Sequence, residues 1–171
     1  HIRVLLLDGI KSIANAIMNQ EALTKLNVSG NQLSAAGTKC IAHALQNHPS
    51  IQELNISSNG MTSNITPDGI IDDVSAVIAI SKAIGTMGAL VKFDISKNSL
   101  YSVGGKAIAQ ALTGNQVMKE LNIAGNELGK TGKYGHADMS GVIAISDAIP
   151  TMGALVKFDV SKNSLCAAGG E

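Results

Sequence analysis

The 171 residues are enough for one domain with a buried core, and 45% of them are hydrophobic. Aromatic residues make up only 2% and tryptophan is absent, so the core must be built mainly from aliphatic side chains. Lys and Arg balance Asp and Glu at 13 each, and this neutral composition excludes the basic surface typical of proteins that bind nucleic acid or anionic membranes.

The first segment of the chain allows two interpretations. A shift of 67 residues places residues 10–18 opposite residues 77–85, where the spacing of apolar residues predicts a helix. Alternatively, residues 2–7 form a degenerate strand. The apolar run in this segment, residues 4–7, is far shorter than the roughly 20 residues that cross a bilayer, so no membrane-spanning segment is expected.

One phrase then occurs five times, in the form L-x-x-L-x-L-x-x-N-x-L with other apolar residues at some leucine positions. The asparagines of successive copies are separated by 28, 39, 28 and 37 residues, so short and long repeats alternate. Residues 77–100 and 142–165 differ at only three positions, which indicates duplication of a unit of two repeats. The copies of the phrase are residues 23–33, 51–61, 90–100, 118–128 and 155–165.

A helical pattern rich in alanine follows the first and third copies, at residues 36–45 and 103–112. In the first of these, Ile41 and Leu45 are four positions apart and predict a helix that buries one face. Each phrase would form a short strand whose first, fourth and sixth positions face the core. Because Phe93 and Phe158 both occupy a fourth position, replacing either with Ala is expected to cost about 3–5 kcal/mol.

The phrase resembles the leucine-rich repeat family, and the 28-residue spacing with a helical second half is similar to its ribonuclease-inhibitor-like subclass. The resemblance covers nearly all of the chain. It implies an α/β fold: a leucine-rich repeat solenoid, or horseshoe arc, with a parallel concave sheet and outer helices. Residues 1–171 would form a single array, and we expect a fragment of a longer one because neither end supplies an obvious cap.

The long repeats contain insertions at residues 62–73 and 129–138, which hold Gly, Pro or polar turn residues and are predicted to be loops on the rim of the solenoid. One interpretation is a contact surface for a partner, since loops on rigid scaffolds commonly carry recognition. The other is a tolerated insertion, because a longer surface loop costs little entropy. The candidate binding residues in these loops are Asp68, Asp72, Tyr134 and His136.

No metal or cofactor is expected. The acidic residues of the first insertion, which include Asp73, lack the spacing of an EF-hand, and the second insertion retains only Asp138. Helix capping is the favoured role, because a carboxylate before a helix stabilises its positive end. His136 is interpreted as a solvated loop residue and not as a catalytic or zinc-binding one. His43 and His48 are weaker candidates still for catalysis or zinc binding.

The repeated asparagine is predicted to be structural, because an inward amide can satisfy backbone groups where the chain turns away from the strand. A row of binding amides is the less favoured alternative. These ladder asparagines are Asn31, Asn59, Asn98, Asn126 and Asn163.

The candidate partner-binding concave face consists of the third and fifth positions of each phrase, which alternate with the buried ones. The third positions alternate in charge, and these rows contain no Trp, Tyr or Arg of the kind that anchors tight interfaces. The residues are Lys25, Glu53, Lys92, Glu120 and Lys157 at the third positions, and Asn27, Asn55, Asp94, Asn122 and Asp159 at the fifth.

The two cysteines, Cys40 and Cys166, belong to repeats that lie four strands apart, roughly 19 Å at the usual strand spacing. A disulfide needs Cα atoms within about 7 Å of each other, so both thiols are expected to be free. Few cysteines and no disulfide favour a reducing compartment and a cytoplasmic location. Secretion is the alternative, because Asn64 begins a glycosylation sequon within the first insertion.

The motifs favour a protein-protein interaction or scaffold module with an unidentified protein as partner. One alternative is an inhibitor or regulator of a specific enzyme, although ribonuclease inhibitors are rich in cysteine and this chain is not. Another is a structural array that self-associates through uncapped ends. No nucleophile, base and orienting group recur at usable spacing, so an enzyme is not expected.

Overall fold

The chain alternates short strands with helices. The computed structural model describes residues 2–66 and 69–165, and the side chains of residues 7–63 and 72–165. The elements are α1 (Ile2–Met18), β1 (Lys25–Asn27), α2 (Ser34–Leu45), β2 (Glu53–Asn55), β3 (Ser63–Thr66), β4 (Gly69–Asp72), α3 (Ser75–Thr86), β5 (Lys92–Asp94), α4 (Tyr101–Leu112), β6 (Glu120–Asn122), α5 (Ser140–Ala148), the 3-10 helix η1 (Ile149–Thr151) and β7 (Lys157–Asp159).

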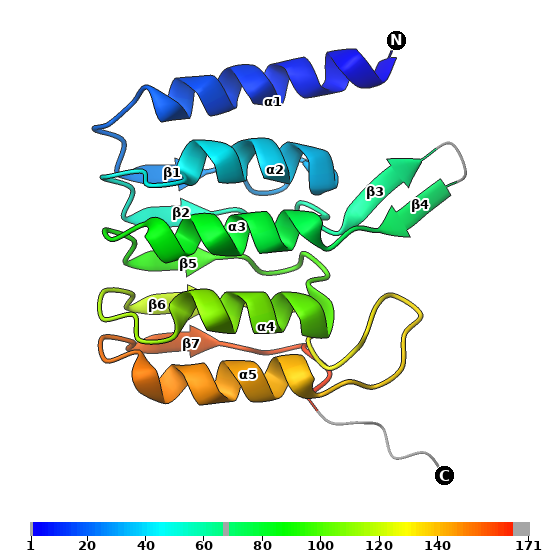
Figure 1. The fold of residues 1–171 in the computed structure, drawn as a ribbon, viewed down its shortest axis with the longest axis vertical. Helices are drawn as coiled ribbons and strands as arrows, with labels where there is room; N and C mark the ends of the chain where they lie inside the picture. The colour runs from blue at the N-terminus through cyan, green and yellow to red at the C-terminus, as the bar shows by residue number, and fades with distance from the viewer. Residues whose placement is uncertain (1, 67–68, 166–171) are drawn as a thin grey trace.

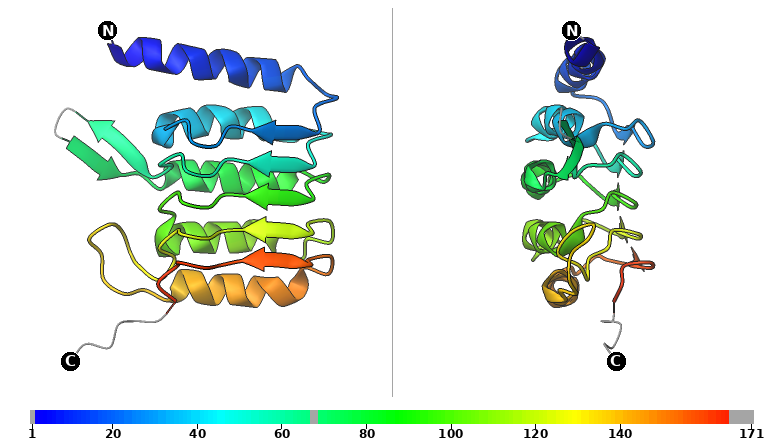
Figure 2. Two further views of the ribbon diagram at one scale, coloured as in Figure 1. Left: turned by 180° about the vertical axis from the view of Figure 1, so that it is seen from behind. Right: turned by 90° about the vertical axis from the view of Figure 1, so that its right-hand side faces the viewer.

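Five strands form one parallel sheet in the order β1-β2-β5-β6-β7. The helices stack in one layer beside this sheet (Figure 1). The side view in Figure 2 shows that they cover only one of its faces. This arrangement confirms the predicted α/β solenoid with a parallel sheet and outer helices.

The core lies between the sheet and the helices. Leu90, Phe93 and Ile95 occupy the first, fourth and sixth positions of one phrase and are at most 1% exposed. Ile41 and Leu45 approach from α2 and are also at most 1% exposed. The side chains on the inner face of the strands, which recur every two residues, therefore pack against helix side chains four residues apart in one mainly aliphatic layer.

Each strand leaves the sheet through a residue in the left-handed conformation, placed directly before the ladder asparagine. The φ angle lies between 55 and 71° at Gly30, Ser58, Lys97, Gly125 and Lys162. Glycine adopts this conformation readily, whereas a residue with a side chain loses about 1 kcal/mol. Because lysine and serine are accepted here, the contacts around the turn impose the conformation.

Residues 2–18 form the single helix α1, so the alternative of a strand at residues 2–7 is wrong. Ala14 and Ile17 are each 5% exposed, and the partly buried Ile10 packs against the same core. These residues lie at positions i, i+4 and i+7, which form one face of a helix. That face makes α1 the first member of the outer layer, next to α2.

The two insertions project from the same edge of the solenoid but differ in structure (Figure 1). In the first, β3 and β4 pair antiparallel, beginning with Ser63 opposite Asp72, so the prediction of a loop is wrong there. Strand pairing satisfies backbone groups that a loop would leave to water. The second insertion contains one isolated bridge, between Lys130 and Ala137, and is otherwise a loop of turns.

Candidate functional site

The third positions of the strands form a row of ion pairs on the open face of the sheet. Lys25 Nζ lies 2.8 Å from Glu53 Oε1, and Glu120 Oε2 lies 3.2 Å from Lys92 Nζ and 3.8 Å from Lys157 Nζ. The hydrogen bond from Lys25 lowers the pKa of Glu53 below its usual value. The charges on this face therefore neutralise one another.

The side chains at the fifth positions also form hydrogen bonds within the solenoid. The repeat phrase did not predict these bonds. In every strand a side-chain oxygen at this position accepts a hydrogen bond from the backbone N–H two residues later, at 2.9–3.1 Å. These local bonds are typical of Asx turns and fix the exit of the strand. The residues are Asn27, Asn55, Asp94, Asn122 and Asp159.

The ladder asparagines bond to the backbone and to one another's main chain. The side-chain oxygens of Asn59, Asn98, Asn126 and Asn163 each accept the backbone N–H of the preceding ladder asparagine, at 2.8–2.9 Å. These four residues are at most 1% exposed. Their amides are therefore occupied inside the fold and not presented to a partner.

The structure brings the two insertions into contact, although they are far apart in sequence. Asp72, the last residue of β4, is exposed, and its Oδ2 accepts a hydrogen bond from the backbone N–H of Lys133 at 3.3 Å. Asp68 lies outside the described residues. Asp72 is thus a link between insertions and not the helix cap that the sequence predicted.

Tyr101, the first residue of α4, lies close to Asp72 and is only 3% exposed. Burial, together with the negative charges of Asp72 and Glu127, raises the pKa of its hydroxyl above the ordinary value of 10.0. Tyr101 therefore belongs to the packed support of the insertions.

The loop of the second insertion carries an exposed aromatic residue. Tyr134 is 89% exposed, and Lys133 Nζ lies 5.1 Å from the centre of its ring. His136 is also exposed in the same loop. We call Asp72, Lys133, Tyr134 and His136 the rim surface.

The helices that follow the insertions begin beside carboxylates. Asp73 accepts the backbone N–H of Ser75 at 2.9 Å, and Asp138 accepts that of Ser140 at 3.0 Å. The nearby hydroxyls of Ser102 and Ser140, together with the backbone N–H of Ser140, lower the pKa of Asp138 from 3.8 to about 2. These two carboxylates have the capping role predicted for the acidic residues.

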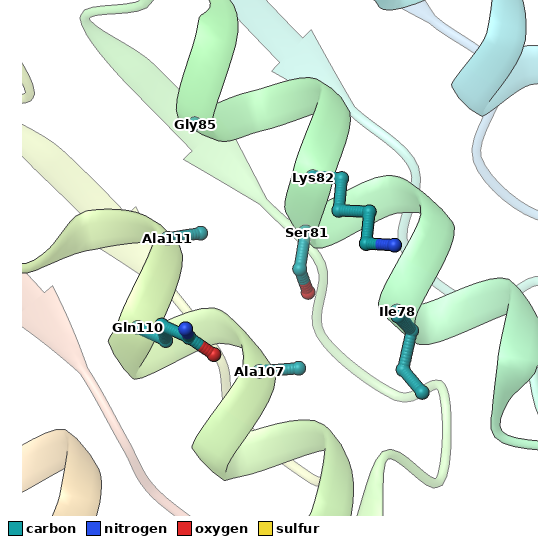
Figure 3. A pocket seen from close by; sticks show the side chains of 7 residues that line it. All are labelled: Ile78, Ser81, Lys82, Gly85, Ala107, Gln110 and Ala111. Atoms are coloured by element: carbon teal, nitrogen blue, oxygen red, sulfur yellow. The ribbon is translucent and has the colours of Figure 1, made fainter.

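A shallow groove of about 240 Å³ lies on the outer surface between α3 and α4. Figure 3 shows that small side chains from the two helices leave this space, with the Lys82 amine and the Gln110 amide at its margins. The repeat pattern did not predict this groove, although Gly and Ala on facing helices were a usable signal. The lining residues are Ile78, Ser81, Lys82, Gly85, Ala107, Gln110 and Ala111.

Other titratable residues are scattered. Within residues 2–66 and 69–165, no group of three or more His, Cys, Asp or Glu side chains is placed to hold a metal ion. His43 is exposed, whereas His48 is 5% exposed and its ring nitrogens have no hydrogen-bond partner in that part of the chain. Cys40 is a free thiol, and Cys166 lies outside the described residues, so their relationship stays a prediction.

No helix in the described part of the chain is both long and apolar enough to cross a bilayer.

Three comparisons place this architecture among known proteins. A family model described as "Leucine Rich repeat" matches residues 22–42 and 114–132. No curated protein matches the chain. Among solved structures, "Leiomodin-1 Actin-Binding Site 2 (ABS2)" is similar with a TM-score of 0.63 and 12% identity, over 86% of this chain and 76% of that chain. At this identity the likeness shows the fold alone.

Proposed function

We propose that this chain, which matches the leucine-rich repeat model over residues 22–42 and 114–132, is a protein-interaction module that recognises its partner through the rim surface. The observation that carries the proposal is the exposure of Tyr134 on a loop whose backbone is bonded to the neighbouring insertion through Asp72. Tyrosine is enriched at the centres of protein interfaces, where its ring supplies apolar area and its hydroxyl a polar contact.

The rigidity of its support favours the rim surface. Asp72 and Lys133 join the loop to the hairpin, and buried Tyr101 lies close to Asp72. A loop that is already positioned loses less conformational entropy when it binds. Recognition by loops on a packed scaffold is the common arrangement.

The concave face supports this role less well. Its charges are paired with one another, and the oxygens at the fifth positions accept backbone hydrogen bonds. A partner docking there would have to displace these contacts or add to them without an aromatic anchor. We therefore assign the candidate residues of the concave face a secondary place in partner binding.

An inhibitor or regulator of an enzyme would also be a protein-interaction module. It would differ only in that its partner is an enzyme. Actin provides one purified probe, because the structural neighbour is titled as an actin-binding site. Co-sedimentation with actin filaments tests this single partner. Its failure would leave other protein partners to the experiment below.

The test compares affinity capture by the intact protein and two variants from a lysate of its source cells. Tyr134→Ala removes the exposed ring of the rim surface, whereas Lys25→Ala is the matched control on the concave face. We expect proteins enriched by the parent to be lost with Tyr134→Ala and retained with Lys25→Ala. Retention with Tyr134→Ala and loss with Lys25→Ala would transfer the binding site to the concave face.

We place the module in the cytoplasm, supported by the small number of cysteines and the free thiol of Cys40. Cell fractionation of the native protein tests this location. Recovery from a secreted or luminal fraction would contradict it.

A further inference from the structure

The groove between α3 and α4 lies where two nearly identical units of the sequence differ. Residues 77–100 and 142–165 differ at only three positions. One of these exchanges isoleucine for valine in the core, and the other two, Lys82 and Gly85, both line the groove. Change between the units is therefore concentrated on the surface of α3 that forms the groove. The corresponding residues of α5 are Asp147 and Pro150.

The two helices that form the groove touch near both ends. A Cβ atom on Gly104, in the first turn of α4, would lie 3.0 Å from Cγ1 of Val77. Near the last turn of each helix, a Cβ atom on Gly85 would lie 3.7 Å from the carbonyl oxygen of Ala111. The groove is thus a depression in the outer surface and not a gap through the helical layer.

The length and lining of the groove suit two turns of a helix. From Ile78 to Gly85 it extends along α3 for about 10 Å at the rise of an α-helix. Figure 3 shows the small side chains of Ser81 and Ala107 pointing into this space. Ile78, at one end, is 39% exposed and adds apolar surface. Apolar side chains of modest size therefore fit between the two helices.

We propose that this groove binds an amphipathic helix of a partner protein, which inserts a ridge of small or aliphatic side chains and places a carboxylate beside Lys82. The groove is a second interaction surface, on the outer face of the solenoid, and its role does not depend on the rim surface.

The walls of the groove favour a helix over an extended peptide. Both walls are α-helices, whose backbone groups bond along their own axes. The hydroxyl of Ser81 also donates within α3, to the carbonyl of Val77 at 2.8 Å. An extended peptide would lose water from its backbone groups here without gaining partners, which is costly. A helix brings its own backbone bonds, and its side-chain ridge packs into a groove between helices.

The charge at the groove selects an acidic partner. Lys82 is exposed, and no ion pair among the described residues includes it. The lining residues, which all belong to that part of the chain, include no carboxylate. A partner carboxylate would be attracted to Lys82 and repelled by Asp147 at the corresponding position of α5. This difference would direct the partner helix to one of two nearly identical repeat surfaces.

Photo-cross-linking identifies the occupant of the groove. The full chain, with p-benzoylphenylalanine in place of Gln110, is irradiated in a lysate of its source cells, and the cross-linked segment is mapped by mass spectrometry. We expect a segment with helical spacing of apolar residues and at least one Asp or Glu. The same group in place of Ser146, on α5, is the control and should not capture this segment. The absence of any segment specific to the Gln110 position would overturn the proposal.

The captured segment is then made as a labelled peptide, and its affinity for the full chain is measured by fluorescence anisotropy. Lys82→Glu should weaken binding about fivefold, since an attraction becomes a repulsion. Gly85→Leu fills the groove and should weaken binding about tenfold or more. Asp147→Lys is the matched charge reversal on α5 and should leave the affinity unchanged. Circular dichroism verifies that each variant is folded and that the peptide is helical when bound.

A charge exchange makes the assignment decisive. Replacing the acidic residue of the peptide with lysine should weaken binding to the parent and restore binding to Lys82→Glu. Unchanged affinity for both Lys82→Glu and Gly85→Leu, or a bound peptide without helical structure, would overturn the proposal. Loss of binding with Tyr134→Ala alone would also overturn it, because the segment would then belong to the rim surface. Failure of the rim surface leaves these results unaffected, so the two proposals can be told apart.

Discussion

The side-chain oxygen of Asn98 accepts a hydrogen bond from the backbone N–H of Asn59, 39 residues earlier, at 2.8 Å. The amide nitrogen of Asn98 also donates to the carbonyls of Ile56 and Ile95, each at 3.0 Å. One side chain thus satisfies backbone groups of two neighbouring repeats at a site with no access to water. The ladder couples adjacent turns of the solenoid through groups that the sheet itself leaves unpaired.

Replacing Asn98 with Ala should lower the free energy of unfolding by roughly 2–4 kcal/mol, because several buried backbone groups lose their partners. Asn31→Ala is the matched control, since Asn31 is exposed and its side chain donates only to carbonyls of its own repeat, those of Val28 and Ser29. It should cost about 1 kcal/mol or less. Denaturant unfolding of both variants measures the difference, and equal midpoints for Asn98→Ala and the parent would contradict the structural role.

A Gly141→Ala substitution should destabilise the protein by roughly 1–3 kcal/mol, as expected for an overpacked site. A Cβ atom at Gly141 would lie 2.7 Å from the backbone of Ser102, so α4 and α5 would have to separate. At Gly85 on α3, the nearest atom to an added Cβ is the carbonyl of Ala111 at 3.7 Å, an ordinary contact. Gly85→Ala should therefore stabilise by up to about 1 kcal/mol through helix propensity. In thermal unfolding, the Tm should be highest for Gly85→Ala, intermediate for the parent and lowest for Gly141→Ala. Any other order refutes the packing assigned to these two glycines.

The two phenylalanines should differ in importance, contrary to the equal losses expected from the repeated phrase. Phe93 is 1% exposed, so Phe93→Ala should cost about 3–5 kcal/mol. Phe158 is half-buried, so Phe158→Ala should cost roughly half as much. Urea unfolding of the two variants makes the comparison. Equal losses would show that the repeat of Phe158 is as well packed as that of Phe93.

Asp138 should make stability depend on pH in the acidic range. Its pKa is about 2 in the folded protein and 3.8 when unperturbed, so its contribution is present above pH about 4. The contribution is lost as the pH falls towards 2, because the unfolded chain then binds the proton more readily. Asp138→Asn should flatten this part of the profile of urea midpoint against pH. If parent and variant lose stability in parallel between pH about 4 and 2, another carboxylate is responsible.

The repeat phrase alone predicted the parallel strands, their alternating charges and the buried first, fourth and sixth positions, because strand periodicity determines which side chains share a face. It could not predict the hairpin of β3 and β4, since turn residues occur in loops and hairpins alike. Nor could it distinguish a helix from a strand at residues 2–7, where a short apolar run is compatible with both.

What the sequence by itself determined is the repeating unit, because each copy depends on local spacing and on contacts with an almost identical neighbour. Only the tertiary structure decided the roles of Asp72, Tyr101 and Phe158. Asp72 bonds to Lys133, 61 residues away, and Tyr101 is buried close to Asp72. Phe158 has the same sequence surroundings as Phe93 but no strand beyond it within the described residues. These differences arise from which segments meet in space, and a repeated phrase contains no record of that.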